Sequence, residues 1–263
     1  MARYSVLIRT YNSAATLAET LRSLSAQVVP PSQFIFVDSG STDDCLALAP
    51  EGAIIHRYVG KEFNYSSALN QGIAYIDCDF CLVISSHTSM QHAEAMAYAL
   101  DTLAADPTVG AAYFCGEVAP APTHRLIDRK NFSGFNGMWN TCGVYRTTLL
   151  HRRPFRPEVP IAEDQEWSRW LLEEEGMKIA RISGGGMKYD NPRGLPLRKW
   201  LREHLSVATF AKAEAKSWKM IARVAYRVIK PSASLRDRYF NFVLFFNLIA
   251  CRIRNPRFKS RYW

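Results

Sequence analysis

The sequence predicts an α/β protein in which a mainly parallel sheet is covered by helices and followed by a basic helical extension. Apolar runs typical of strands alternate with amphipathic helical stretches, an order that favours right-handed crossovers between parallel strands. The charge is also divided: residues 1–190 carry 16 Lys or Arg and 21 Asp or Glu, whereas residues 191–263 carry 17 and 3. We therefore expect one domain over residues 1–190 and a basic extension over residues 191–263.

The individual elements follow from hydrophobic spacing. The tract "YSVLIR" at residues 4–9 predicts the first strand, and Leu17, Leu21 and Leu24 recur with the spacing of a helix that buries one face. Later strands are predicted at residues 34–38, 53–57, 80–85 and 178–182, and helices from near Thr42, over 64–77 and 91–105, from "AEDQEW" onward, and over about 195–229. The tract "SGGGMKYDNPRG" predicts a flexible joint between the two regions.

The carboxyl ends of three predicted strands carry polar residues. These ends are residues 9–12 (RTYN), 38–41 (DSGS) and 85–87 (SSH). Ligands of open parallel sheets bind at this edge. The sequence therefore predicts a binding site there.

Four tracts taken together resemble the family 2 glycosyltransferases, which bind nucleotide sugars on a GT-A fold. They are "SVLIRTYNSAATLAETLRSLSAQ", "FIFVDSGSTDDCLALA", "KEFNYSSALNQGI", which is similar to bacterial rhamnosyltransferase-like members, and "AEDQEWSRWLLEEEGMKI". The resemblance covers roughly residues 4–182 and implies an inverting glycosyltransferase. Such an enzyme moves a sugar from a nucleoside diphosphate sugar to a hydroxyl of a lipid-linked or polysaccharide acceptor, here in bacterial surface polysaccharide synthesis.

The resemblance also implies residues for the donor nucleotide. Asp38 is expected to accept hydrogen bonds from the nucleoside, Thr10 and Tyr11 to wall the base, and Lys61 and Asn70 to face the diphosphate or the sugar. The full set predicted to bind nucleotide is Thr10, Tyr11, Asp38, Ser39, Lys61, Asn70 and Ser86.

The predicted metal site departs from the family pattern. Members usually carry an Asp-x-Asp sequence after the fourth strand that holds Mg²⁺ or Mn²⁺, but this chain has His87 there. The literal Asp77-Cys78-Asp79 precedes that strand and is rejected because it lies at the wrong edge. His87 with Asp190 is one expectation, and imidazole suits Mn²⁺ better than Mg²⁺. Metal-free binding, with His87 hydrogen-bonded to a phosphate, is the alternative.

Catalysis by an inverting enzyme needs a base for the acceptor hydroxyl. Asp164, with Glu163 beside it, matches the family base, although acidic residues also stabilise helix N-termini without any further role. Trp139, Asn140 and Trp167 are expected to line the acceptor site. His204 is a weaker candidate for the phosphates.

The extension contains "YFNFVLFFNLIAC" at residues 239–251. Thirteen helical residues rise about 20 Å, less than the ~30 Å hydrocarbon core of a bilayer. With the basic tail "RIRNPRFKSRYW", this helix is expected to lie on an anionic membrane surface. Internal packing or a homodimer contact is the alternative.

The remaining expectations concern the location and class of the protein. The start of the chain lacks the pattern of a secretion signal, and six scattered cysteines fit reduced thiols, so a cytoplasmic protein on the inner face of the membrane is expected. Two other classes stay open: a nucleotidyltransferase that makes nucleotide sugars, and a nucleic-acid-binding protein that uses the basic tail. The first expects a Gly-rich phosphate loop after the first strand, and "RTYNSAATL" is not one. No nucleic-acid partner is expected, since the second leaves residues 1–182 unexplained.

Overall fold

The computed structural model describes residues 2–254 apart from 118, 120, 160, 191–196 and 233. The strands are β1 (Tyr4–Thr10), β2 (Gln33–Asp38), β3 (Ile54–Arg57), β4 (Phe80–Ser85), β5 (Thr88–Met90), β6 (Val109–Phe114), β7 (Thr123–Ile127), β8 (Cys142–Arg146), β9 (Lys178–Ser183) and β10 (Met187–Tyr189). The helices are α1 (Ala14–Ser25), η1 (Asp44–Leu48), α2 (Tyr65–Ile73), α3 (Ala95–Ala105), α4 (Thr147–Arg152), α5 (Glu163–Glu173), α6 (Leu197–Ser206), η2 (Val207–Ala211), η3 (Ala213–Lys216), α7 (Trp218–Ile229) and α8 (Leu235–Arg254).

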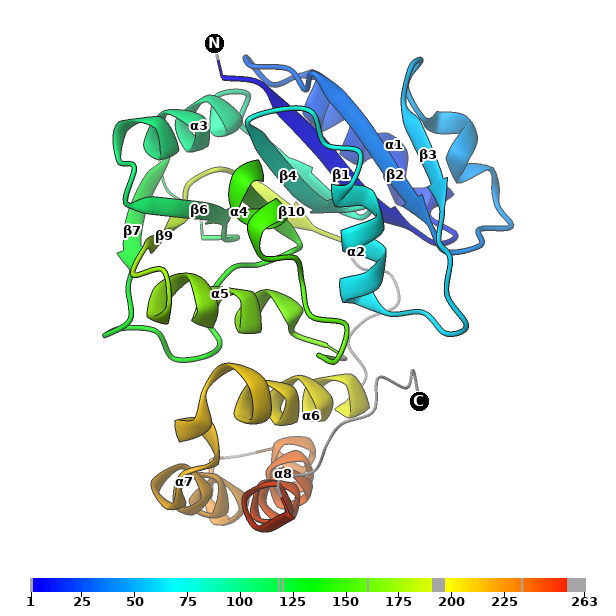
Figure 1. Cartoon of the computed structure of the whole chain (residues 1–263). Helices are drawn as coiled ribbons and strands as arrows, with labels where there is room; N and C mark the ends of the chain where they lie inside the picture. The colour runs from blue at the N-terminus through cyan, green and yellow to red at the C-terminus, as the bar shows by residue number, and fades with distance from the viewer. Residues whose placement is uncertain are drawn as a thin grey trace.

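Eight strands form the central sheet in the order β3-β2-β1-β4-β8-β6-β9-β7 (Figure 1). β3, β2, β1 and β4 are mutually parallel, β6 is parallel to β9, and only β8 and the edge strand β7 run antiparallel to their neighbours. The predicted mainly parallel sheet is therefore confirmed. The carboxyl ends of β1, β2 and β4 meet at one edge of it, because Thr10 pairs with Asp38 and Arg9 pairs with Ser85.

Helices cover both faces of the sheet. On one face α1 and α3 pack against alternate strand residues such as Val6 and Ile8, and on the other α2, α4 and α5 pack against residues such as Leu7 and Val37. This alternation follows from the twofold repeat of side chains along a strand. Gly72 lets α2 approach closely, because a Cβ at that position would lie 2.3 Å from Leu7 Cδ1.

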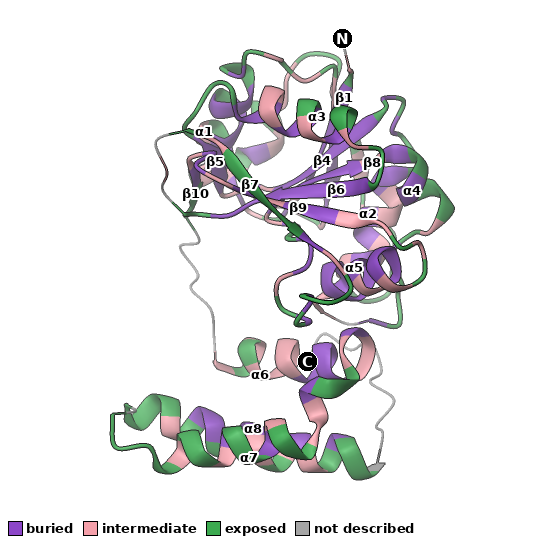
Figure 2. Ribbon diagram, turned by 90° about the vertical axis from the view of Figure 1, so that its left-hand side faces the viewer, coloured by how far each residue is buried: buried purple, intermediate pink, exposed green. Residues whose placement is uncertain are grey.

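The helices after residue 196 have a core of their own. Leu205 and Val207 join Ile221 of α7 and Leu244 and Leu248 of α8 in that core. α6 lies between the sheet domain and the pair formed by α7 and α8 (Figures 1 and 2). Ala162, which precedes α5, packs against this core, and Ser206 donates a hydrogen bond to the Ile161 carbonyl. The extension is thus joined to the domain beside the start of α5.

Some local predictions differ from the structure. β10 pairs antiparallel with β5, so Met187–Tyr189 form a strand where a flexible joint is predicted; strands of three residues are too short to give a periodic signal. The predicted apolar helix is longer than expected, since α8 spans Leu235–Arg254, and no helix in the described part of the chain is long and apolar enough to cross a membrane. The predicted boundary at residue 191 and the terminal tail 255–263 lie outside the described residues.

Candidate functional site

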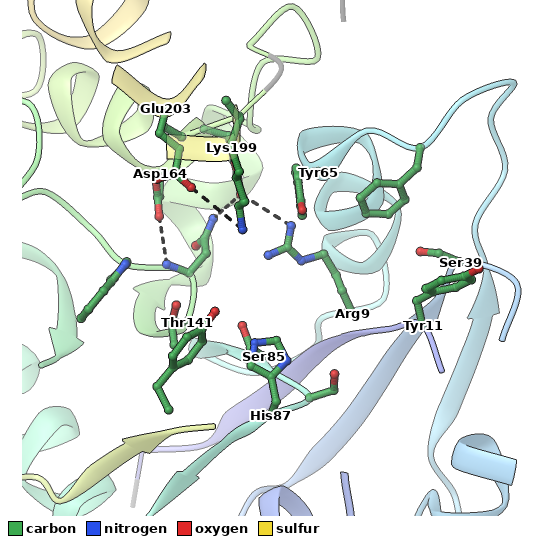
Figure 3. Close-up of a pocket in the computed structure, with 18 of the residues that line it drawn as sticks. Arg9, Tyr11, Ser39, Tyr65, Ser85, His87, Thr141, Asp164, Lys199 and Glu203 are labelled. Carbon is green, nitrogen blue, oxygen red and sulfur yellow. Dashed lines mark hydrogen bonds and ion pairs between the residues drawn. The ribbon is translucent and has the colours of Figure 1, made fainter. Parts of the chain in front are cut away.

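A cavity of about 850 Å³ lies at the carboxyl ends of β1, β2 and β4 (Figure 3). These strand ends form one wall, here called the strand wall. The opposite wall, here called the helical wall, consists of the loop 135–141, the start of α5 and the side of α6. The structure brings nine of the predicted site residues to this cavity. They are Thr10, Tyr11, Ser39, Ser86, His87, Trp139, Asn140, Glu163 and Asp164.

Asp38 supports the strand wall from behind. Its buried carboxylate accepts hydrogen bonds from Thr10 Oγ1 (3.3 Å), Ser41 Oγ (2.5 Å) and the backbone N–H groups of Gly40 (3.1 Å) and Ser41 (3.1 Å). Gly40 has φ +91°, a conformation that favours glycine and lets the chain turn around the carboxylate. Asp38 is not among the cavity-lining residues, whereas Ser39 next to it is. The geometry indicates that Asp38 fixes the turn that presents Ser39.

The end of β4 is held by contacts to α1 and β10. Ser86 Oγ lies 2.8 Å from Ser13 Oγ, and the Ser86 carbonyl accepts a hydrogen bond from Thr16 Oγ1 (2.8 Å). The His87 carbonyl accepts one from the Asp190 N–H (2.9 Å), and the His87 ring lies edge-on to Tyr189 with centroids 4.9 Å apart. These contacts fix the imidazole in the floor of the cavity.

The opposite wall carries buried carboxylates. Ala162, with φ +60°, turns the chain at the start of α5, a left-handed conformation that is uncommon for alanine. The Asp164 side chain accepts hydrogen bonds from the backbone N–H groups of Asn140 (3.1 Å) and Gln165 (2.8 Å). Burial, and then the charge of Glu163, raise the pKa of Asp164 to about 7. A carboxylate with this pKa can take or give a proton near neutral pH.

Glu163 is held by Asn140 and Arg9. Asn140 Nδ2 donates to Glu163 Oε1 (3.0 Å), and Asn140 Oδ1 accepts from the Tyr145 hydroxyl (2.6 Å). Burial raises the pKa of Tyr145 well above its ordinary value, so its hydroxyl stays protonated and serves as a donor. Through its N–H and its side chain, Asn140 therefore contacts both acids of the pair.

Arg9 brings a partly buried positive charge to the same wall. Its Nη1 atom lies 3.6 Å from Glu163 Oε1, too long for a hydrogen bond, and this buried nitrogen has no hydrogen-bond partner within the described structure. The guanidinium also lies over the Tyr65 ring, 4.8 Å from its centroid. Because Arg9 also lines the cavity, it is a candidate ligand for an anionic group there.

Helix α6 adds two further charges. Lys199 and Glu203 line the cavity and form an ion pair at 4.0 Å, one turn apart (Figure 3). Burial raises the pKa of Glu203; Lys199 opposes that shift and Glu163 adds to it. No role for Arg9, Lys199 or Glu203 is predicted from the sequence. The available signals are weak: a single charge in the apolar strand of Arg9, and a Lys–Glu pair at i, i+4 spacing, which usually marks a solvated helix face.

Five predicted site residues do not line the cavity. Asn70 donates to the Phe155 carbonyl (2.7 Å) and accepts from its N–H (3.0 Å), so its amide braces the chain before α5. Trp167 is fully buried and packs edge-on to Tyr145, so it belongs to the core in place of the predicted contact with the acceptor. Lys61 and Asp190 are exposed and lie outside the cavity lining, and the buried Asp38 lies behind that lining.

His204 also lies outside the cavity lining, although its helix contributes to it. Its ring packs against Phe135 and Phe240, and its Nδ1 atom lies 2.9 Å from the Trp200 carbonyl oxygen. Burial lowers the pKa of His204, which disfavours the charged form that would bind a phosphate. The geometry indicates that His204 joins α6 to its neighbours.

The described residues do not fit a metal site held by the protein. They contain no group of three His, Cys, Asp or Glu side chains arranged to hold an ion. His87 and Asp190 are adjacent through their backbones, but only His87 lines the cavity, and the Asp190 side chain is exposed. The charged groups that the cavity does gather are Arg9, Lys199 and three carboxylates.

Comparisons with known proteins agree with the fold. A family model described as "Glycosyl transferase family 2" matches residues 5–153. The O-antigen chain rhamnosyltransferase RfbN of Salmonella typhimurium is 26% identical over 201 residues, which make up 68% of this chain and 63% of that relative. The chain thus spans somewhat less than two thirds of the length of the curated relative it matches.

Solved structures share the architecture at low sequence identity. Mannosyltransferase PcManGT from Pyrobaculum calidifontis, in complex with GDP-Man and Mn²⁺, has a TM-score of 0.63 and 18% identity, covering 97% of this chain and 87% of that one. S. aureus TarS 1-349 with UDP-GlcNAc has a TM-score of 0.61 and 17% identity, covering 94% and 81%. Glucosyl-3-phosphoglycerate synthase from Mycobacterium tuberculosis, with Mg²⁺ and uridine-diphosphate, has a TM-score of 0.59 and 16% identity, covering 80% and 79%. These likenesses identify the GT-A fold.

Proposed function

This chain belongs to glycosyl transferase family 2, and from that premise we propose that it is an inverting enzyme that transfers a sugar from a nucleoside diphosphate donor to an acceptor hydroxyl. The observation that carries the proposal is the buried Asp164, whose side chain meets the cavity opposite the strand ends. Its pKa of about 7 suits a base that must be ionised before reaction and protonated after it. The curated relative, an O-antigen chain rhamnosyltransferase, supports sugar transfer in polysaccharide synthesis, and the acceptor we propose is lipid-linked or a polysaccharide.

The proposed donor site is the strand wall. Thr10, Tyr11 and Ser39 offer hydroxyl groups and an aromatic ring to the nucleoside, and Ser86 and His87 extend the polar surface toward the centre of the cavity. Tyr11 is half exposed, so part of its side chain is accessible to a base. In this proposal Asp38 acts through the turn it holds.

The proposed reaction is a single displacement. The acceptor hydroxyl gives its proton to the Asp164 carboxylate, and its oxygen forms a bond to the anomeric carbon of the donor. The bond from that carbon to the diphosphate oxygen breaks, and the electron pair leaves with the diphosphate. Glu163, held by Asn140 and Arg9, keeps a second negative charge beside Asp164 and so favours proton uptake by the base.

Stabilisation of the leaving diphosphate is proposed to come from side chains. Arg9 and Lys199 supply positive charge in the cavity, and His87 supplies a hydrogen-bonding imidazole. Charged donors in a partly desolvated site interact with developing negative charge more strongly than they would in water. The positive charge in this proposal is that of side chains, because the described residues form no group of three His, Cys, Asp or Glu side chains that would hold a metal ion.

A thermal-shift screen of the full chain against UDP, GDP and dTDP, with EDTA or with Mn²⁺, tests the donor site. Ligand at 100 times its Kd stabilises a protein by about 2.7 kcal/mol. We expect one nucleotide to raise Tm by several degrees, and the shift to persist in EDTA. No shift with any nucleotide would contradict the proposal. A shift seen only with Mn²⁺ would mean that a metal ion at His87 and Asp190, and not the side-chain cations, binds the diphosphate.

A further inference from the structure

Helix α8 has two apolar stripes on opposite sides. Phe240, Leu244, Leu248 and Cys251 are buried in the core of the extension. Tyr239, Phe242, Phe246 and Ile253 recur with the same helical spacing but are 61%, 51%, 54% and 71% exposed. At 100° per residue these sets lie about half a turn apart. Packing within the described structure therefore accounts for only one of them.

Helix α7 repeats the pattern and adds charge. Trp218, Tyr226 and Ile229 form an exposed apolar stripe, with 58%, 60% and 71% of each residue accessible. An exposed cationic stripe lies beside it, shifted by one residue along the sequence. It consists of Lys219, Arg223, Arg227 and Lys230. The two helices are linked at one end, where the Arg252 guanidinium lies 5.0 Å from the centre of the Trp218 ring.

The exposed stripe of α8 faces away from the sheet domain. Phe240, on the buried side of α8, packs edge-on to Trp200 and His204 of α6. α6 in turn contributes Lys199 and Glu203 to the cavity. The α8 surface opposite Phe240 therefore faces away from α6, and the α7–α8 pair lies beyond α6 as seen from the sheet domain (Figures 1 and 2).

We propose that the face of α7 and α8 that carries these exposed stripes binds the surface of an anionic lipid bilayer, with both helices parallel to the membrane plane. Aromatic and aliphatic side chains beside a row of Lys and Arg are the pattern of interfacial helices, in which the apolar groups enter the acyl boundary and the cations meet lipid phosphates. No described helix is long and apolar enough to span the membrane, which agrees with a helix pair that lies on it.

Charge favours this partner over a second copy of the chain. Residues 191–263 carry 17 Lys or Arg and three Asp or Glu, so two such faces brought together about a twofold axis would repel each other. An anionic surface instead gains from every cation. The inference concerns binding alone and does not depend on the donor or on the chemistry proposed for the cavity.

The test is flotation of the full chain with neutral phosphatidylcholine vesicles and with vesicles containing 30% phosphatidylglycerol. We expect binding to the anionic vesicles at low salt and little binding to neutral ones. Arg223→Gln with Arg227→Gln is expected to lower the partition coefficient about 30-fold. Phe242→Ser with Phe246→Ser is expected to lower it at least about tenfold. All four residues are exposed, so the variants should fold, and their Tm values check this.

Control variants remove exposed cations or an exposed apolar side chain elsewhere on the surface. Arg129→Gln with Lys130→Gln removes two exposed cations, and Val28→Ser removes an exposed apolar side chain. Equal losses in the controls, or no flotation with anionic vesicles at low salt, would overturn the proposal. So would a dimer that the Phe242→Ser, Phe246→Ser pair dissociates, or salt-sensitive binding to RNA that exceeds binding to the vesicles.

Discussion

The two walls of the cavity contrast in how their carboxylates are held. On the strand wall, Asp38 accepts hydrogen bonds from a hydroxyl pair and two backbone N–H groups, and its charge is satisfied by the turn around it. On the helical wall, Asp164 is buried beside Glu163, and its pKa is raised to about 7. The first arrangement stabilises a shape, whereas the second keeps a proton acceptor in an unfavourable environment. This contrast is the basis for our proposal that the strand wall binds the donor and that the helical wall carries the base.

The largest effect is expected from the helical wall. Asp164→Asn should lower kcat by about 10³-fold, because the side chain can no longer take the proton of the acceptor hydroxyl. The affinity for the nucleoside diphosphate should change less than about threefold, since the strand wall is untouched. Asp101→Asn, the same change on the exposed side of α3, is the matched control. A nearly normal kcat for Asp164→Asn would contradict the proposal that the helical wall supplies the base.

The strand wall could be predicted from sequence because its pattern is local. An apolar strand followed by polar residues identifies its own carboxyl end, and parallel pairing then gathers Thr10, Ser39 and Ser86 at one edge. The direction in which a side chain points was harder to predict. Arg9 follows Leu7 by two residues, and the strand repeat sends both to the face covered by α2 and α5. The proposed reactive carboxylates lie on that face because α5 packs there.

The helical wall depends on contacts between segments far apart in the chain. Asp164 was identified through the resemblance of its tract to a family, and not through spacing. Lys199 and Glu203 reach the cavity because α6 packs beside the start of α5, an arrangement that no local pattern encodes. Trp167 shows the limit of helical spacing as a signal. The spacing predicts that this apolar side chain faces inward, but it does not distinguish a ligand-binding surface from the protein core, where the side chain in fact lies.

The next largest effect should separate two lysines. Lys199→Met is expected to lower kcat about 10²-fold, because it removes a positive charge that faces the leaving diphosphate. Lys199→Arg should recover part of the loss. Lys61→Met, a change at the exposed lysine that is predicted from sequence to bind nucleotide, should leave both kcat and KM near normal. Steady-state kinetics on the three variants would reverse our assignment if Lys61→Met were the damaging one.

A smaller effect is expected at Asp38, and it should appear first in stability. Asp38→Ala leaves Thr10 Oγ1 and the N–H groups of Gly40 and Ser41 without their acceptor. Unmade buried hydrogen bonds cost about 1–3 kcal/mol each, and partial access of water to the turn favours a total near 2 kcal/mol, or about 4–8 °C in Tm. Nucleotide affinity should fall with it. A variant with normal Tm and lost affinity would instead make Asp38 a direct ligand.

The smallest effect is expected in the pH dependence of kcat and of stability. Asp164 must be ionised to act as base, so kcat should rise about tenfold between pH 6 and pH 8, with a midpoint near 7. Stability should move the other way. The folded pKa lies above the unfolded value of 3.8, so the folded state binds the extra proton between those values and loses stability as pH rises toward 7.

Removing a neighbouring charge sharpens this prediction. The Glu203 carboxylate raises the pKa of Asp164, although less than burial and Glu163 do, so Glu203→Gln should move the midpoint of the kcat profile to lower pH. Asp164→Asn should abolish the decline of Tm between pH 5 and pH 8, whereas Asp38→Ala should lower Tm by a similar amount throughout that range. The prediction would be contradicted by a wild-type kcat that is constant from pH 6 to pH 8 together with a Tm that does not fall. Such a result would mean that burial beside Glu163 does not destabilise the Asp164 carboxylate, and the contrast between the two walls would be lost.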